Sequence, residues 1–267
     1  TNYQGLVLKY NSSGALGWSD FYDGGGNIAQ QGFVDAHFNG SQLYVVGTSY
    51  QGAIYNRDIT IARFSTSGTK NQVRYQDNGS SDGYKIKVVG STIHVGALDD
   101  TNDDLLYLTC STSFTSGSTV TLEESTAVTW TSINEMDTDG STISFAYDAG
   151  STTQIRTYNG SSWVSITNSD LYDVRDILVD GSNVLLTGRD LKTSPNVHYE
   201  LVFVKYLNSS TTLQEYESLQ PKPGSTDHQA FSSHGVDIYK NGDGDYSIMG
   251  NLILDDDPSD GDPSISN

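Results

Sequence analysis

Basic side chains are scarce in this sequence, with 14 Lys and Arg against 33 Asp and Glu and a formal net charge of −19 at pH 7. A chain with this charge repels phosphate backbones and acidic lipid surfaces, and it has no cluster of Lys and Arg that could hold either. Nucleic acid is therefore not an expected partner. Cations, neutral glycans and basic protein surfaces remain candidates.

The sequence also has only one cysteine and no long apolar run. The single cysteine, Cys110, cannot form a disulfide within the chain. It stands where matching strands carry an aromatic residue, so we expect a buried, inert thiol. No apolar run approaches the roughly 20 residues of a membrane-spanning helix, and insertion into a membrane is not expected.

No window shows convincing helical periodicity, and the hydrophobic share is only 35%. Gly, Ser, Thr, Asn and Asp are plentiful instead, while 17 Tyr, 8 Phe and 3 Trp supply material for a core. This mixture is typical of many short strands joined by many turns, and not of a disordered chain.

Two hairpin patterns alternate along the chain. The first consists of an apolar strand, a glycine turn and a second strand, and it recurs at residues 34–47, 85–96, 134–147, 175–188 and 236–250. The second lies between these copies, for example in DITIARFSTSGTKNQVRYQ. The period is about fifty residues with four strands in each unit, which is typical of a β-propeller blade.

The two ends of the sequence complete this pattern. Residues 6–22 form a second hairpin without a first, and residues 236–250 form a first hairpin without a second. Together they make one blade, and such closure removes the open edge of a sheet. We therefore predict an all-β fold, a five-bladed β-propeller of four-stranded antiparallel blades whose last blade is closed by strands from both termini.

The same stretches resemble a known group of repeats. GLVLKYNSSGALGWSDFYDGGG at residues 5–26 and FVDAHFNGSQLYVVGTS at 33–49 are similar to bacterial β-propeller repeats of the seven-bladed-propeller type, found in large secreted and cell-surface proteins. The likeness is clear over residues 5–70, weaker over 174–206 and poor over 103–165. The resemblance implies the fold and an extracellular or cell-surface location, but no reaction.

The domain boundary is predicted from composition. Residues 1–254 are expected to form the propeller. Residues 255–267, which read DDDPSDGDPSISN, are expected to form an acidic linker rich in Pro and Asp. Both ends suit one domain of a larger polypeptide.

An ionisable residue lies five positions before the turn glycine in every copy of the first hairpin. These residues are Asp35, Lys85, Glu135, Asp176 and Asp237. On the innermost strands they would form a ring, and close like charges raise carboxylate pKa values or require a cation. Three interpretations stay open: carboxylates that accept hydrogen bonds from neighbouring blades with Lys85 as counter-charge, a bound cation, or catalysis.

The catalytic interpretation follows five-bladed glycoside hydrolases, which carry two or three acids on inner strands. Asp35, Glu135, Asp176 and Asp237 are the available acids. Glu135 would act as the general acid, with Asp35 or Asp237 as the base, and an inverting reaction needs the two carboxyl groups about 6.5–9.5 Å apart.

Loop residues supply two further candidate sites. Asp99, Asp100, Asp103 and Asp104 offer a carboxylate cluster of the kind that calcium favours, against the alternative of a solvated acidic loop. A set of loop aromatics and bases is suited to binding a sugar or protein surface, against the alternative of packing between blades. These residues are Tyr50, Tyr55, Trp130, Tyr172, Arg189, His198 and His228.

These patterns favour a non-enzymatic extracellular or cell-surface binding and adhesion module. It would recognise a glycan or a cell-surface protein through the loop face of the propeller, with calcium as a candidate cofactor. The alternatives are a glycoside hydrolase that uses the inner-strand carboxylates, and a purely structural spacer.

Overall fold

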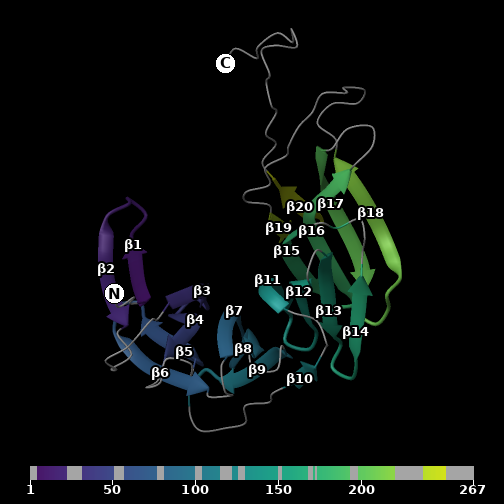
Figure 1. The fold of residues 1–267 in the computed structure, drawn as a ribbon. Helices are drawn as coiled ribbons and strands as arrows, with labels where there is room; N and C mark the ends of the chain where they lie inside the picture. Colours follow the sequence, from purple (N-terminus) through teal and green to yellow (C-terminus); the bar gives the residue numbers. More distant parts are fainter. Residues whose placement is uncertain are drawn as a thin grey trace, which may run out of the picture. The chain divides into compact units, whose positions relative to one another are not determined.

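The computed structural model contains no helix in the part of the chain that it describes, and all regular structure there is β-strand (Figure 1). The described residues are 5–22, 32–50, 57–76, 81–99, 104–114, 122–125, 130–149, 152–167, 171, 173–192, 198–219 and 237–250. Among them no helix is long and apolar enough to span a membrane. Residues 255–267, the predicted linker, lie outside them.

The chain divides into two compact units. Unit 1 comprises Thr1–Ser141 and Tyr147–Gly150, and unit 2 comprises Thr142–Ala146 and Ser151–Asn267. The division passes through the strand β12 (Ile143–Ala149).

Unit 1 contains one two-stranded and two four-stranded antiparallel sheets. The first pairs β1 (Gly5–Tyr10) with β2 (Leu16–Tyr22). The second has the order β3 (Gly32–Phe38), β4 (Gln42–Tyr50), β5 (Arg57–Ser65) and β6 (Lys70–Gln76). The third has the order β7 (Ser81–Val89), β8 (Thr92–Asp99), β9 (Asp104–Ser111) and β10 (Leu122–Ser125).

The next sheet has the order β11–β12–β13–β14, and β11 (Trp130–Thr138) belongs to unit 1. Unit 2 continues with β13 (Thr152–Tyr158) and β14 (Trp163–Thr167). It holds a further sheet of β15 (Asp173–Asp180), β16 (Asn183–Lys192), β17 (His198–Leu207) and β18 (Leu213–Leu219), and a two-stranded sheet of β19 (Asp237–Lys240) and β20 (Tyr246–Met249).

This organisation confirms the predicted all-β fold of four-stranded antiparallel sheets, with each strand hydrogen-bonded to the next along the chain, as in propeller blades. The two hairpins predicted to lack a partner are the two-stranded sheets β1–β2 and β19–β20. The number of blades and the closure of the last one stay predictions.

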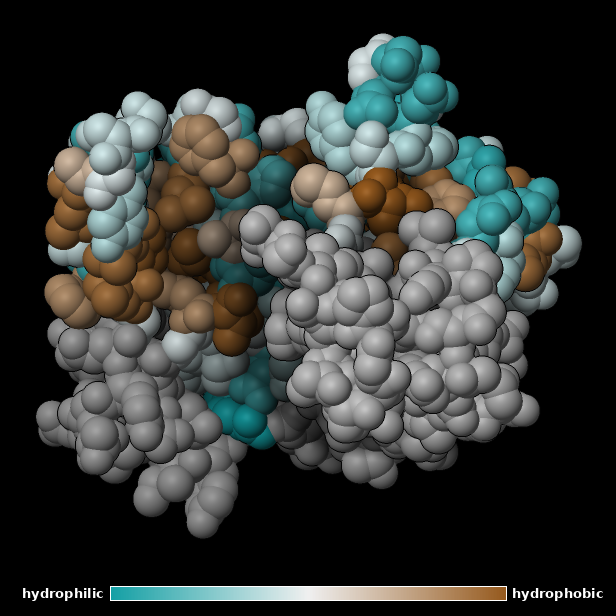
Figure 2. Space-filling model, turned by 90° about the horizontal axis from the view of Figure 1, so that it is seen from above, coloured by the Kyte–Doolittle hydropathy of each residue, from teal (hydrophilic) through white to brown (hydrophobic). Residues whose placement is uncertain are grey.

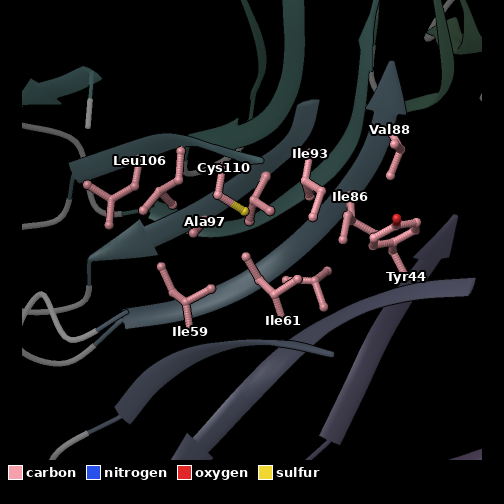
Figure 3. Close-up of a cluster of buried hydrophobic side chains, with 12 residues drawn as sticks. Tyr44, Ile59, Ile61, Ile86, Val88, Ile93, Ala97, Leu106 and Cys110 are labelled. Carbon is pink, nitrogen blue, oxygen red and sulfur yellow. The ribbon is translucent and has the colours of Figure 1, made fainter. Parts of the chain in front are cut away.

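One hydrophobic core of unit 1 lies where the β3–β6 and β7–β10 sheets face each other (Figure 3). Alternate side chains of each strand point into it, since successive residues of a strand face opposite sides. Ile59 and Ile61 of β5 and Ile86 of β7 belong to this cluster, and all three are buried. Burying a side chain of this size contributes roughly 1.5–3 kcal/mol, so the cluster holds the two sheets together.

Cys110 is part of that core, as the sequence predicted. It is buried opposite Ile93, in the register that Phe64 occupies opposite Leu43 in the preceding sheet. In unit 2 a corresponding core gathers around Val184, Leu186 and Val204.

A β-bulge interrupts the first strand in three of the four-stranded sheets. The register shifts between Phe33 and Asp35 in β3, between Gly83 and Lys85 in β7, and between Val174 and Asp176 in β15. Each shift comes directly before the ionisable position of that strand, and a bulge re-aims the side chain beside it.

A glycine permits each bulge by letting the two backbones approach. A Cβ atom on Gly47 would lie 1.8 Å from the carbonyl oxygen of Gly32, and one on Gly188 would lie 2.0 Å from that of Asp173. In the β7–β8 pair the glycine lies on the first strand instead of the second, and Gly83 of β7 pairs with the buried Ala97 of β8. One member of each pair is therefore glycine.

We predict that Gly47→Ala destabilises the protein by about 3 kcal/mol or more, because the added methyl group has no space without a backbone shift. Gly32→Ala in the same sheet is the matched control, since a Cβ there meets no atom within 4 Å. Urea unfolding of both variants measures the difference. Similar stabilities would contradict the role assigned to Gly47.

Candidate functional site

The ionisable positions predicted from the repeats lie on the first strand of each sheet: Asp35 on β3, Lys85 on β7, Glu135 on β11, Asp176 on β15 and Asp237 on β19. Asp35 is half-buried, whereas Asp237 is exposed. Each unit holds its own part of the set.

In unit 1 two of these side chains, Asp35 and Lys85, contact the next first strand. Asp35 Oδ2 accepts a hydrogen bond from the backbone N–H of Ile86 at 2.9 Å. Lys85 Nζ donates to Glu135 Oε1 at 2.8 Å, and both side chains are largely shielded from solvent. The three residues therefore join β3 to β7 and β7 to β11.

A second level of charged contacts lies two residues further along the same strands. Lys87 forms an ion pair with Asp137, which is buried. His37 takes the corresponding position on β3, and the Lys87 charge contributes to lowering its pKa after desolvation, which is the larger cause. The repeat pattern could have indicated this level, since residues two apart share one face of a strand.

The surroundings of Glu135 have opposing effects on the pKa of its carboxyl group. Desolvation raises the pKa of its carboxyl group, and the charges of Asp35 and Asp137 add to this, while the charge and hydrogen bond of Lys85 oppose it. The lysine partner therefore limits the rise in this pKa.

Unit 2 repeats the contact of Asp35. Asp176 Oδ2 accepts from the backbone N–H of Ile238 at 2.7 Å, and its Oδ1 accepts from the N–H of Ile177 at 2.8 Å. Ile238 follows Asp237 as Ile86 follows Lys85, so both bonds join equivalent positions of consecutive repeats.

A second carboxylate of β15 also holds the β19–β20 hairpin. Asp180 Oδ2 accepts from Lys240 Nζ at 2.6 Å and from Tyr246 Oη at 2.5 Å. The bond to Asp180 raises the pKa of Tyr246 to about 12.

The predicted ligand-binding residues are mostly not described. Arg189 is the exception: its Nη2 lies 2.9 Å from Asp173 Oδ2, which also contacts Arg175 at 2.6 Å. This pairing places Arg189 within its own sheet. Tyr50, Trp130 and His198 lie on strands, but the structure does not describe their side chains. Tyr55, Tyr172 and His228 lie outside the described residues.

The predicted calcium cluster is described only at its edges. Asp99 is buried and pairs across the strands with Asp104, while Asp100 and Asp103 lie outside the described residues. The described residues hold no group of three or more His, Cys, Asp or Glu that could bind a metal ion. A calcium site at these residues stays a prediction.

His94 on β8 is a buried titratable group that the sequence did not single out. Its Nδ1 lies 2.6 Å from Tyr107 Oη, and its Nε2 is buried without a hydrogen-bond partner among the described residues. Desolvation lowers the pKa of the imidazole to about 4, and the Lys87 charge adds to this effect.

We predict that His94 makes the protein sensitive to acid. The folded pKa of about 4 lies below the ordinary 6.5, so the unfolded chain binds more protons between these values and stability falls as the pH drops through this window. The expected slope is up to about 1.4 kcal/mol for each pH unit.

His94→Leu is the comparison, because Leu185 is buried at the equivalent position of the β15–β18 sheet. Urea unfolding should be measured for the wild type and the variant from pH 7 to pH 4. The free energy of unfolding of the wild type should fall more steeply with decreasing pH than that of the variant. Parallel pH profiles would contradict the prediction.

No family model matches this sequence, and no curated protein matches it either. Among solved structures, the β-propeller domain of the trilobed protease from Pyrococcus furiosus is similar, with a TM-score of 0.48, 10% identity and coverage of 73% of this chain and 59% of that one.

A Synechocystis apocarotenoid oxygenase variant matches with a TM-score of 0.44, 9% identity and coverage of 82% and 60% of the two chains. Prolyl oligopeptidase B from Galerina marginata matches with a TM-score of 0.43, 11% identity and coverage of 93% and 38%. This chain thus spans about 60% of the length of the oxygenase.

The predicted role as an extracellular binding and adhesion module was wrong. The similar structures are named as an oxygenase and as chimeras of it, not as adhesion or glycan-binding proteins. The physical reason is that repeat motifs specify packing, so the resemblance could supply a fold but no ligand. At these identities the likeness concerns the fold alone and assigns no role to any residue.

Proposed function

We propose that this chain is a non-enzymatic structural scaffold whose first-strand charges fasten consecutive blades to one another. The observation that supports it is the repeated bond from an aspartate to the backbone of the next first strand, Asp35 to Ile86 and Asp176 to Ile238. The same contact in two different units suits a packing role that is repeated along a chain.

The partners of the acids support this proposal over catalysis. Asp35 accepts from a backbone amide, Glu135 pairs with Lys85, and Asp176 accepts from two backbone amides. A general acid or base must instead direct its carboxyl group at a reacting atom.

We also propose that the chain belongs with the bacterial β-propeller repeats and forms five blades, the last made of β19–β20 and β1–β2. An exposed apolar face supports it. Leu8 and Tyr10 are 44% and 56% exposed, whereas Ala62 and Phe64 at the equivalent positions of a four-stranded sheet are fully buried. Location outside the cell stays a prediction from the resemblance.

We predict that Asp35→Ala costs about 1.5–3 kcal/mol of stability, because the N–H of Ile86 loses a charged acceptor. Asp35→Asn keeps an acceptor oxygen and should restore most of this loss. Urea unfolding compares the two, with Asp176→Ala and Asp176→Asn as the matched pair in unit 2.

The same variants test the alternative to a scaffold. A panel of glycosides, esters and peptides should show no hydrolysis by the wild type. Hydrolysis that disappears in a stably folded Asp35→Asn variant would overturn the proposal.

We predict the register of the closing pair from the complete sheets, where Val45 lies opposite Ala62. The equivalent residues are Ile248 and Leu8, so a Leu8→Cys/Ile248→Cys variant should form a disulfide within one chain on mild oxidation. Mass spectrometry of proteolytic fragments identifies the bond, and the native Cys110 stays buried.

The control variant Leu8→Cys/Ser247→Cys is one residue out of register, which places the two side chains on opposite faces. Equal cross-linking of the control, or disulfides only between chains, would contradict closure in this register. It would leave the scaffold role of Asp35 untouched.

A further inference from the structure

Asparagine side chains close several hairpin turns of this protein in the same way. Asn39 Oδ1 accepts from the N–H of Ser41 at 3.1 Å, from its Oγ at 3.0 Å and from the N–H of Gln42 at 2.9 Å. Asn159 Oδ1 accepts from the N–H of Ser161 at 3.1 Å, from its Oγ at 2.8 Å, from the N–H of Ser162 at 3.0 Å and, at 3.5 Å, from the Oγ of Ser162. We name the arrangement that both asparagines share, three donors around one side-chain oxygen, the Asn cradle.

In both turns a glycine follows the asparagine, and both glycines have a positive φ, 91° at Gly40 and 86° at Gly160. Asn39 and Gly40 are exposed, and Asn159 is partly exposed. In neither asparagine does the amide nitrogen bond to another described residue. The group that would leave in a reaction at Cγ is therefore free, while the oxygen is held.

We propose that Asn39 and Asn159 are sites of spontaneous deamidation in the folded protein. The backbone nitrogen of the following glycine loses its proton to solvent base and attacks Cγ, and the bond from Cγ to Nδ2 breaks as ammonia leaves with a proton. Water then opens the five-membered succinimide ring at either carbonyl, which gives aspartate or isoaspartate. The balance is one water consumed and one ammonia released.

The cradle promotes this reaction for an electrostatic reason. Negative charge develops on Oδ1 when the glycine nitrogen adds to Cγ, and three donors already point at that oxygen. Donors placed where charge develops lower the barrier of such an addition. The missing side chain of glycine removes the steric obstacle to the attacking nitrogen.

The chain itself shows that the aspartate product fits. In the β11–β12 turn Asp139 takes the place of Asn39, with Gly140 and Ser141 after it. Asp139 Oδ1 accepts from the N–H of Ser141 at 2.8 Å and from its Oγ at 2.9 Å. Deamidation to aspartate therefore preserves the turn and adds a negative charge, whereas isoaspartate lengthens the backbone and disrupts it.

Three other asparagines serve as internal controls. Asn11 has the cradle, with Oδ1 bonded to Ser13 and to the N–H of Ala15, but Ser12 follows it. Asn241 precedes a glycine, but no described residue donates to its Oδ1, and its Nδ2 donates to Ser247. Asn208 is followed by Ser209, and its Nδ2 donates to Thr142 and to the carbonyl of Gly181.

The experiment is incubation of the whole folded protein in mildly alkaline buffer, followed by peptide mass spectrometry that distinguishes amide from acid at each asparagine. Asn39 and Asn159 should convert about tenfold faster than Asn11 and Asn241, which corresponds to a barrier difference of about 1.4 kcal/mol. Asn208 should be slowest. Ser12→Gly should bring the rate at Asn11 close to that at Asn39.

Two results would overturn the proposal. Conversion at Asn241 as fast as at Asn39 would show that the cradle does not accelerate deamidation. Conversion at Asn11 as fast as at Asn39 would show that the following glycine does not accelerate it. Asn39→Asp should keep the melting temperature of the wild type, and a large decrease would contradict the fit of the product.

Discussion

The packing of consecutive repeats depends on a carboxylate that accepts a hydrogen bond from the backbone of the next first strand. A first strand has a partner on one side only, so its other side presents N–H groups that lose contact with water when the next repeat packs there. Asp35 and Asp176 satisfy one such group each, at Ile86 and Ile238. Because the side chains of both isoleucines are buried, the bond fixes the strand in the register that forms the core.

The bulge before each of these positions contributes to the same contact between repeats. A regular strand alternates its side chains between two faces, and an inserted residue allows the acid to turn toward the neighbouring strand while the buried residues after it keep their face. The close backbone approach in turn requires glycine, and this requirement is met by either strand. Gly47 and Gly188 meet it from the second strand and Gly83 from the first, which shows that the pair and not the single position is constrained.

The repeat period was enough to predict the strand order, the hairpin turns and the position of Asp35, because each depends on residues close in sequence. The offset from the turn glycine even found the equivalence of Asp35 and Asp176. The ion pair of Lys87 with Asp137 follows from the same period, because the two residues lie two positions beyond Lys85 and Glu135 and have the same spacing of 50 residues. The ligand-binding residues stay a prediction, since the repeat constrains strands and turns and carries no pattern for the loops.

The strongly acidic composition also gains a physical explanation from these contacts. Asp35 and Asp176 accept hydrogen bonds from backbone N–H groups, and Glu135 pairs with Lys85. Side-chain oxygens do the same at the turns, where Asn39 and Asp139 hold equivalent hairpins with an amide and a carboxylate. A fold of many short strands has many edges and turns, and each one leaves N–H groups without a strand partner. Short oxygen-bearing side chains satisfy these groups locally, so such a fold can be rich in Asp and Asn without those residues forming a binding site.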